Sequence, residues 1–163
     1  MMQAHSELII YLDKVANNYS KLLATAPNSK VACVVKANAY GLGASQIYQH
    51  LQTKGCDTFF VSCLEEAIHL RELNETSQWQ NTRIAVLHGP HYKEVRDFSH
   101  YNLIPVLNSI PQFEAWFEHT EENPTPSIVH IDTGMNRLGI SIEEANTYKG
   151  KYKSLDIFPG THV

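Results

Sequence analysis

A lysine and a tyrosine lie close together just after an apolar run near the start of the sequence. The stretch VVKANAYGLG, residues 34–43, places Lys36 at the end of the run and Tyr40 four residues later. Burial disfavours the charged form of a lysine, so a lysine held there loses its proton more readily and becomes a nucleophile for carbonyl compounds. Taken alone, a lysine after a strand is more often a surface residue whose ammonium reaches solvent.

A second cation occurs after another apolar run. The stretch HIDTGMNRLG, residues 130–139, places Arg137 between Gly134 and Gly139. The carboxyl ends of parallel strands meet on one side of a sheet or barrel, so Arg137 and Lys36 are expected at the same site. A guanidinium there would bind an anion through paired hydrogen bonds. The alternative is a solvated arginine in an ordinary loop.

The elements that would position these residues alternate along nearly the whole chain. The first apolar run is expected to be a strand buried on both faces. Asp13 is predicted to cap the first helix, and boxes of the type Ser-x-x-Glu/Gln predict later helix starts at Ser62, Ser109 and Ser141. Five such strand–helix units indicate an α/β fold with a parallel sheet and helices outside it. The predicted strands cover residues 31–35, 58–61, 83–87, 103–107 and 127–131.

Two architectures fit this repeat: an open doubly wound sheet or a (β/α)8 barrel. No GxGxxG follows the first strand, which weakens the dinucleotide-binding form of the open sheet. A closed barrel typically needs about 250 residues. The 163 residues therefore suit either a small complete α/β domain or the front part of a barrel.

Composition narrows the class of protein. The chain has 13 Lys and Arg against 17 Asp and Glu, a net charge of -4, which argues against a nucleic-acid partner. No basic leader or membrane-length apolar run is evident, and three cysteines without a CxxC pair suit a reducing compartment. We therefore expect a cytoplasmic protein that acts on a small molecule. His88 and His91 have no third ligand beside them, so no metal site is predicted.

Together, VVKANAYGLG and IDTGMNRLG resemble the two N-terminal signature segments of the alanine racemase family, which are fold type III pyridoxal phosphate enzymes. The first motif is highly specific, and the second matches the order and spacing of the family. The resemblance covers essentially the whole chain but only the front part of the family's protein. It implies that residues 1–163 are the N-terminal part of the pyridoxal-phosphate-binding (β/α)8 barrel domain, without the C-terminal β domain.

The resemblance also implies roles for three residues. Lys36 would carry pyridoxal 5'-phosphate covalently and act as one of two catalytic bases, and Tyr40 would hydrogen-bond the cofactor phosphate. Arg137 would lie near the cofactor phenolate and the substrate carboxylate. In the family, the opposite base is a tyrosine from the β domain of the partner subunit, so a homodimer is expected. The implied function is interconversion of L- and D-alanine, which supplies D-alanine for peptidoglycan.

Two departures from the family pattern stand out. Leu42 replaces the usual histidine of the first motif, and His130 replaces a lysine that can be carbamylated to support the arginine. The alternatives are a fold type III amino-acid decarboxylase and a barrel that binds pyridoxal phosphate without turnover. A chain of these residues alone is expected to leave barrel edges unpaired and to be inactive as a racemase.

Overall fold

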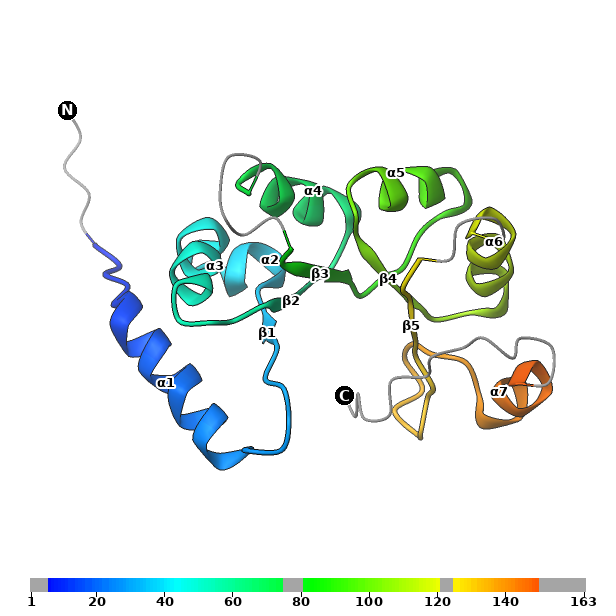
Figure 1. The fold of residues 1–163 in the computed structure, drawn as a ribbon, viewed down its shortest axis with the longest axis horizontal. Helices are drawn as coiled ribbons and strands as arrows, with labels where there is room; N and C mark the ends of the chain where they lie inside the picture. The colour runs from blue at the N-terminus through cyan, green and yellow to red at the C-terminus, as the bar shows by residue number, and fades with distance from the viewer. Residues whose placement is uncertain (1–5, 75–80, 121–124, 150–163) are drawn as a thin grey trace.

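Within residues 6–74, 81–120 and 125–149, which the computed structural model describes, five parallel strands form one sheet in sequence order. The sheet curves into an arc (Figure 1). A doubly wound sheet reverses its strand order at a switch point, whereas a barrel keeps it, so this order is that of a barrel. The strands are β1 (Cys33–Val34), β2 (Thr58–Val61), β3 (Arg83–Val86), β4 (Ile104–Leu107) and β5 (Ile128–Val129).

Helices precede, connect and follow the strands, and those that connect them line the outer side of the arc (Figure 1). This arrangement confirms the predicted alternation. In the described ranges no helix combines the length and apolar character that a membrane crossing needs. The helices are α1 (Leu12–Thr25), α2 (Lys36–Tyr40), α3 (Ala44–Gln52), α4 (Leu64–Glu72), the 3-10 helix η1 (Tyr92–Glu94), α5 (Val95–His100), α6 (Ile110–Thr120) and α7 (Ile142–Lys149).

The two faces of the sheet have different environments because successive side chains of a strand point to opposite faces. On the helix-covered face, Phe59 and Ile84 are fully buried in the main core. Phe98 of α5 packs edge-to-face on Trp116 of α6, with ring centroids 6.2 Å apart. The other face carries a smaller cluster that consists of Ala85, Ile104, Val106 and Ile128. The smaller cluster forms the floor on which a ligand site can be built.

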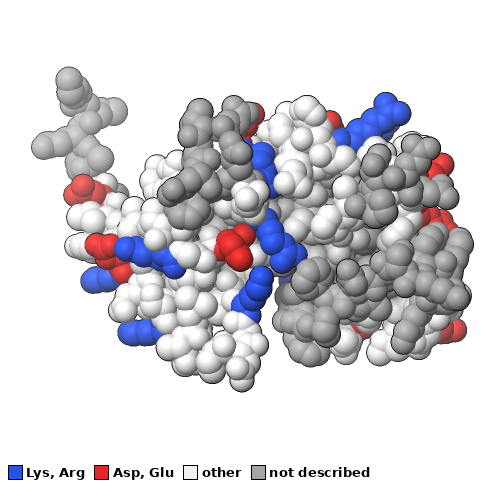
Figure 2. Space-filling model, viewed as in Figure 1, with Lys and Arg blue, Asp and Glu red and all other residues white. Residues whose placement is uncertain are grey.

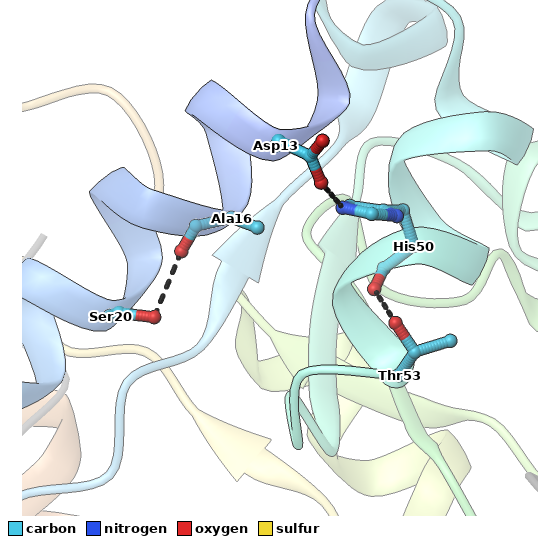
Figure 3. A network of polar contacts seen from close by, with 5 residues as sticks. All are labelled: Asp13, Ala16, Ser20, His50 and Thr53. Carbon is cyan, nitrogen blue, oxygen red and sulfur yellow. Dashed lines mark hydrogen bonds and ion pairs between the residues drawn. The ribbon is translucent and has the colours of Figure 1, made fainter.

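The first helix begins two residues earlier than predicted. Its N-cap residue is Tyr11, so Asp13 lies in the first turn and does not cap the helix. The Asp13 carboxylate instead points across to α3, where its Oδ1 lies 3.4 Å from Nε2 of His50 (Figure 3). This contact joins an exposed carboxylate to a half-buried imidazole. The apolar contact of Ala16 and Tyr19 with the core docks the helix.

Two further predictions need correction, and one is confirmed. Strand β1 is only two residues long, and Val34 is 45% exposed because its side of the sheet lines a cavity, so the run is not buried on both faces. Helix α4 has Cys63 rather than Ser62 as its N-cap residue. The box at Ser141 is confirmed, since the amide of Glu144 donates to Ser141 Oγ and the amide of Ser141 donates to the Glu144 carboxylate.

Candidate functional site

A cavity of about 580 Å³ opens at the carboxyl ends of the strands. Four of the residues that line it, Lys36, Tyr40, His130 and Arg137, come from the two segments that the sequence singled out. Among the described residues, Lys36 and Arg137 are the lysine and the arginine that line the cavity, and no aspartate or glutamate lines it. On the face shown in Figure 2, Lys and Arg side chains run down the middle of the molecule with an acidic side chain among them. The apolar wall includes Val34, Phe60, Leu87, Val106, Ile128 and Leu138.

The segment after β1 adopts an unusual backbone conformation. Lys36 is half-buried and opens α2, but the next four residues all have positive φ. The φ values are 51° for Ala37, 53° for Asn38 and Ala39, and 56° for Tyr40. A left-handed conformation costs roughly 1–2 kcal/mol for each residue that has a Cβ atom. Such strain persists only where surrounding contacts determine the conformation, and it concentrates at functional sites.

Several hydrogen bonds hold this left-handed turn. The amide of Gly41 donates to the carbonyl of Ala37 at 2.9 Å, and the amide of Gly43 donates to the carbonyl of Asn38 at 3.0 Å. The Asn38 side chain accepts from the amide of Ala44 at 2.8 Å, at the start of α3. Asparagine tolerates positive φ better than most residues, so Asn38 suits the centre of the turn. The turn leaves the Tyr40 side chain 64% exposed at the cavity.

The loop that carries Arg137 is organised by one carboxylate. Asp132 accepts hydrogen bonds from the amides of Gly134 and Met135 at Oδ1 and from that of Asn136 at Oδ2, at 2.8–2.9 Å. These bonds, led by the one from Gly134, hold the pKa of Asp132 below its usual value. Gly139 closes the loop at φ 106°, where a Cβ would lie 2.8 Å from the amide nitrogen of Asp132. The loop presents an exposed Arg137 at the cavity.

His130 is held by a side chain that the sequence analysis did not single out. Nδ2 of Asn108, just after β4, donates to the carbonyls of Leu87 and Val106 at 2.8 and 2.9 Å. Because both amide donors face carbonyls, Asn108 Oδ1 is the atom 2.8 Å from His130 Nδ1 and must accept from it. In its neutral form, the imidazole therefore carries the proton on Nδ1. Its Nε2 is left with a lone pair and has no partner among the described residues.

Glu66 of α4 is a second residue that the sequence analysis missed. Its Oε1 accepts from the amide of Ala37 at 2.7 Å, and its Oε2 accepts from the amide of Ser62 at 2.8 Å. The predicted capping box had assigned Glu65 to this helix start. Helix α4 begins one residue later than this box predicts, and the shift turns Glu66 rather than Glu65 towards the preceding chain.

The two histidines of HGPH lie in different settings. His88 lines the cavity, whereas His91 precedes η1 and donates its amide hydrogen to the Glu94 carboxylate at 2.8 Å. In the ranges that the structure describes, no group of three or more His, Cys, Asp or Glu side chains is arranged to hold a metal ion.

Comparison with known proteins identifies the family. A family profile described as "Alanine racemase, N-terminal domain" matches residues 10–157. The chain belongs to the alanine racemase family. Among curated relatives, a protein named "Alanine racemase, catabolic" from Agrobacterium fabrum is 40% identical over 155 residues, which are 94% of this chain and 39% of that protein. An alanine racemase of Rickettsia typhi is 39% identical over 140 residues, 84% of this chain and 34% of that protein.

A solved structure of the alanine racemase family has the same fold. The alanine racemase from Bartonella henselae, described as having covalently bound pyridoxal phosphate, superposes with a TM-score of 0.80 at 32% sequence identity. The match covers 90% of this chain and 41% of the Bartonella chain. The chain thus spans about two fifths of the length of the relatives it matches. Its fold is the N-terminal part of the (β/α)8 barrel of this family.

Proposed function

We propose that residues 1–163 are the N-terminal part of the cofactor-binding barrel domain of a pyridoxal-phosphate-dependent alanine racemase. The protein would interconvert L- and D-alanine and supply D-alanine for peptidoglycan. The observation that carries this proposal is the grouping of Lys36, Tyr40 and Arg137 around one cavity in a chain of this family. The relatives reported above are racemases, which favours racemisation over decarboxylation or binding without turnover.

The residues of the cavity fit pyridoxal phosphate. The cofactor has an aldehyde, a flat aromatic ring and an anionic phosphate. The Lys36 amine suits the aldehyde, and the exposed Tyr40 hydroxyl suits a phosphate oxygen. Apolar side chains such as Phe60 and Leu87 suit the ring, and no described acidic side chain lines the cavity to repel the phosphate.

Each of the three residues has a distinct task in the reaction. When bound, pyridoxal phosphate supplies an electron sink that stabilises negative charge at the substrate α-carbon. Lys36 Nζ anchors the cofactor and then moves a proton at that carbon on one face. Tyr40 donates its hydroxyl hydrogen to the phosphate. Arg137 binds the substrate carboxylate with parallel N–H bonds and thereby orients the α-carbon towards Lys36.

A racemase also needs a base on the opposite face of the substrate. We assign this base to a residue outside these 163 residues, contributed by the partner subunit of a homodimer. We place the protein in the cytoplasm, because Cys33, Cys56 and Cys63 are all free thiols, as a reducing compartment maintains them. The substrate is a small amino acid, and neither nucleic acid nor a membrane takes part.

The test is chiral chromatography of L-alanine incubated with pyridoxal phosphate and the natural protein, purified whole. We expect D-alanine to accumulate until the two enantiomers are equal. Lys36→Ala should abolish conversion, while Lys30→Ala, at an exposed lysine away from the cavity, should leave it unchanged. Release of carbon dioxide from a basic amino acid, without racemisation of alanine, would identify a decarboxylase instead.

A further inference from the structure

One carboxylate on α4 joins the ends of two neighbouring strands. Glu66 accepts from Ala37, which follows Lys36 after β1, and from Ser62, which follows β2. Lys36 and Ser62 both line the cavity. Glu66 therefore binds the backbone at two places beside the cavity, Ala37 and Ser62, without lining the cavity itself.

This contact differs from an ordinary helix cap. A glutamate at the third position of a helix usually reaches back to the amide of the N-cap residue, which here is Cys63. Glu66 instead uses one oxygen for Ser62, before the N-cap, and the other for Ala37 in a different element. Charge-assisted hydrogen bonds of this kind are roughly twice as strong as neutral ones. Helix capping alone does not require the bond to Ala37.

The left-handed turn depends on that bond. From Lys36 to Leu42, within the part of the chain that the structure describes, the backbone hydrogen bonds join residues of the segment 35–44 to one another. The exception is the bond from the amide of Ala37 to Glu66. It acts on the first left-handed residue, next to Lys36. Loss of the hydrogen bond between Ala37 and Glu66 would let the strained turn relax and the Lys36 backbone rotate.

We propose that Glu66 is the positioning residue for Lys36. It fixes the left-handed turn from α4 and so sets where the lysine amine stands relative to Ser62 and the rest of the cavity. Glu66 touches neither cofactor nor substrate. This inference rests on the proposed function for the role of Lys36, but the support that Glu66 gives to the turn is independent of that function.

The first measurement is amide hydrogen exchange of the natural protein without added substrate, read by mass spectrometry over residues 36–43 and around Ser62. Glu66→Gln keeps the size of the side chain, but its amide nitrogen can no longer accept one of the two bonds. We expect exchange in these peptides to accelerate about tenfold or more, as a lost charge-assisted bond implies. The matched control is Glu65→Gln, an exposed neighbour on the same helix, which should leave both peptides unchanged.

The second measurement is attachment of pyridoxal phosphate to Lys36, trapped with borohydride at short times, together with alanine kinetics. We expect Glu66→Gln to slow attachment and to lower kcat by about 10- to 100-fold, because small misplacements of a reacting group have effects of this size. KM should change by less than about threefold, since Arg137 still binds the substrate. If Glu66→Gln does not fold, Glu66→Asp, which retains the charge but reaches only one amide, carries the test with a smaller effect.

The outcomes separate the two proposals. Unchanged exchange in both Glu66 variants would show that Glu66 does not fix the left-handed turn. Faster exchange with unchanged attachment and kcat would also overturn the positioning role, because Glu66 would then be merely structural. If the unmodified protein neither attaches pyridoxal phosphate at Lys36 nor racemises alanine, the proposed function fails, and the exchange data still decide whether Glu66 fixes the turn.

Discussion

The two loops that bring cations to the cavity are built in different ways. The turn after β1 places four consecutive residues with Cβ atoms at positive φ. Besides a bond to the start of the adjacent α3, it is hydrogen-bonded to Glu66 of α4. The loop after β5 is organised by its own Asp132, which binds three amides within four residues. Lys36 is half-buried, whereas Arg137 is exposed.

This difference matches the chemistry that we assign to each loop. A group that forms a covalent bond must be held in one place, and strained backbone supported from a distance can hold it there. The exposed Arg137 has a long side chain with many rotamers, so its guanidinium can reach a carboxylate from more than one backbone position. The first loop is therefore sensitive to distant substitutions, whereas the second is self-contained.

The largest expected effect comes from exchanging the type of cation in each loop. Lys36→Arg keeps the charge but removes the amine that attaches the cofactor and moves the proton, so turnover should fall by about 10³-fold or more. Arg137→Lys keeps the charge and loses only the paired geometry, so kcat/KM should fall by about tenfold. Steady-state alanine kinetics check both. Equal losses would show that the loops do not differ in the way proposed.

The next effect separates Arg137 from its neighbour His130. Arg137→Ala removes charge-assisted hydrogen bonds to the substrate carboxylate and should lower kcat/KM by about 10- to 100-fold. His130→Ala removes a side chain that Asn108 holds at the cavity wall, and the loss should stay below about tenfold. The same kinetic assay measures both variants. Negligible effects of both would show that neither belongs to the site.

A matched pair of asparagines tests the stability of the two loops. Asn38 and Asn136 have nearly the same φ, 53° and 54°, so alanine meets the same backbone strain at each. Asn38 also accepts the amide of Ala44 in a partly buried position, whereas Asn136 makes a longer, exposed bond of 3.2 Å to Gly134. Asn38→Ala should therefore lower the free energy of unfolding by about 1 kcal/mol more than Asn136→Ala. Urea denaturation measures both, and the reverse order would contradict the account.

The smallest effect concerns the pH dependence of the second loop. The pKa of Asp132 in the folded state lies below that of an unfolded aspartate, about 3.9. Its contribution to stability is therefore complete above that value and is lost as the pH falls through the folded pKa. The stability difference between the unmodified protein and Asp132→Asn should shrink between pH 7 and pH 3 in urea denaturation. A difference that is constant with pH would show that the carboxylate charge does not hold the loop.

Local patterns were enough to predict most of the fold. The alternation of apolar residues predicted β2 at its observed bounds, and the box at Ser141 predicted the start of α7. Each of these signals is contained within a few consecutive residues. Lys36 and Arg137 were expected at one site because strand ends in a parallel sheet share one side. The functional assignment of these two residues and of Tyr40 came from the resemblance to the alanine racemase family. Their roles stay predictions until they are tested.

Contacts between distant segments could not be predicted in this way. Nothing local in Ala37-Asn38-Ala39-Tyr40 favours a left-handed turn, since alanine and tyrosine prefer negative φ, and its support comes from Glu66 on another element. The tautomer of His130 likewise depends on Asn108 after a different strand. Such groups become visible only when the fold has brought the strand ends together.

The most direct test of the central claim is to reduce the natural protein with borohydride in the presence of pyridoxal phosphate and to map the labelled peptide by mass spectrometry. The account predicts that the label lies on Lys36, and that Lys36→Ala leaves the segment 31–43 unlabelled. Recovery of the label on Lys30 or Lys54, with Lys36 unmodified, would contradict the assignment of the cofactor lysine and with it the proposed site.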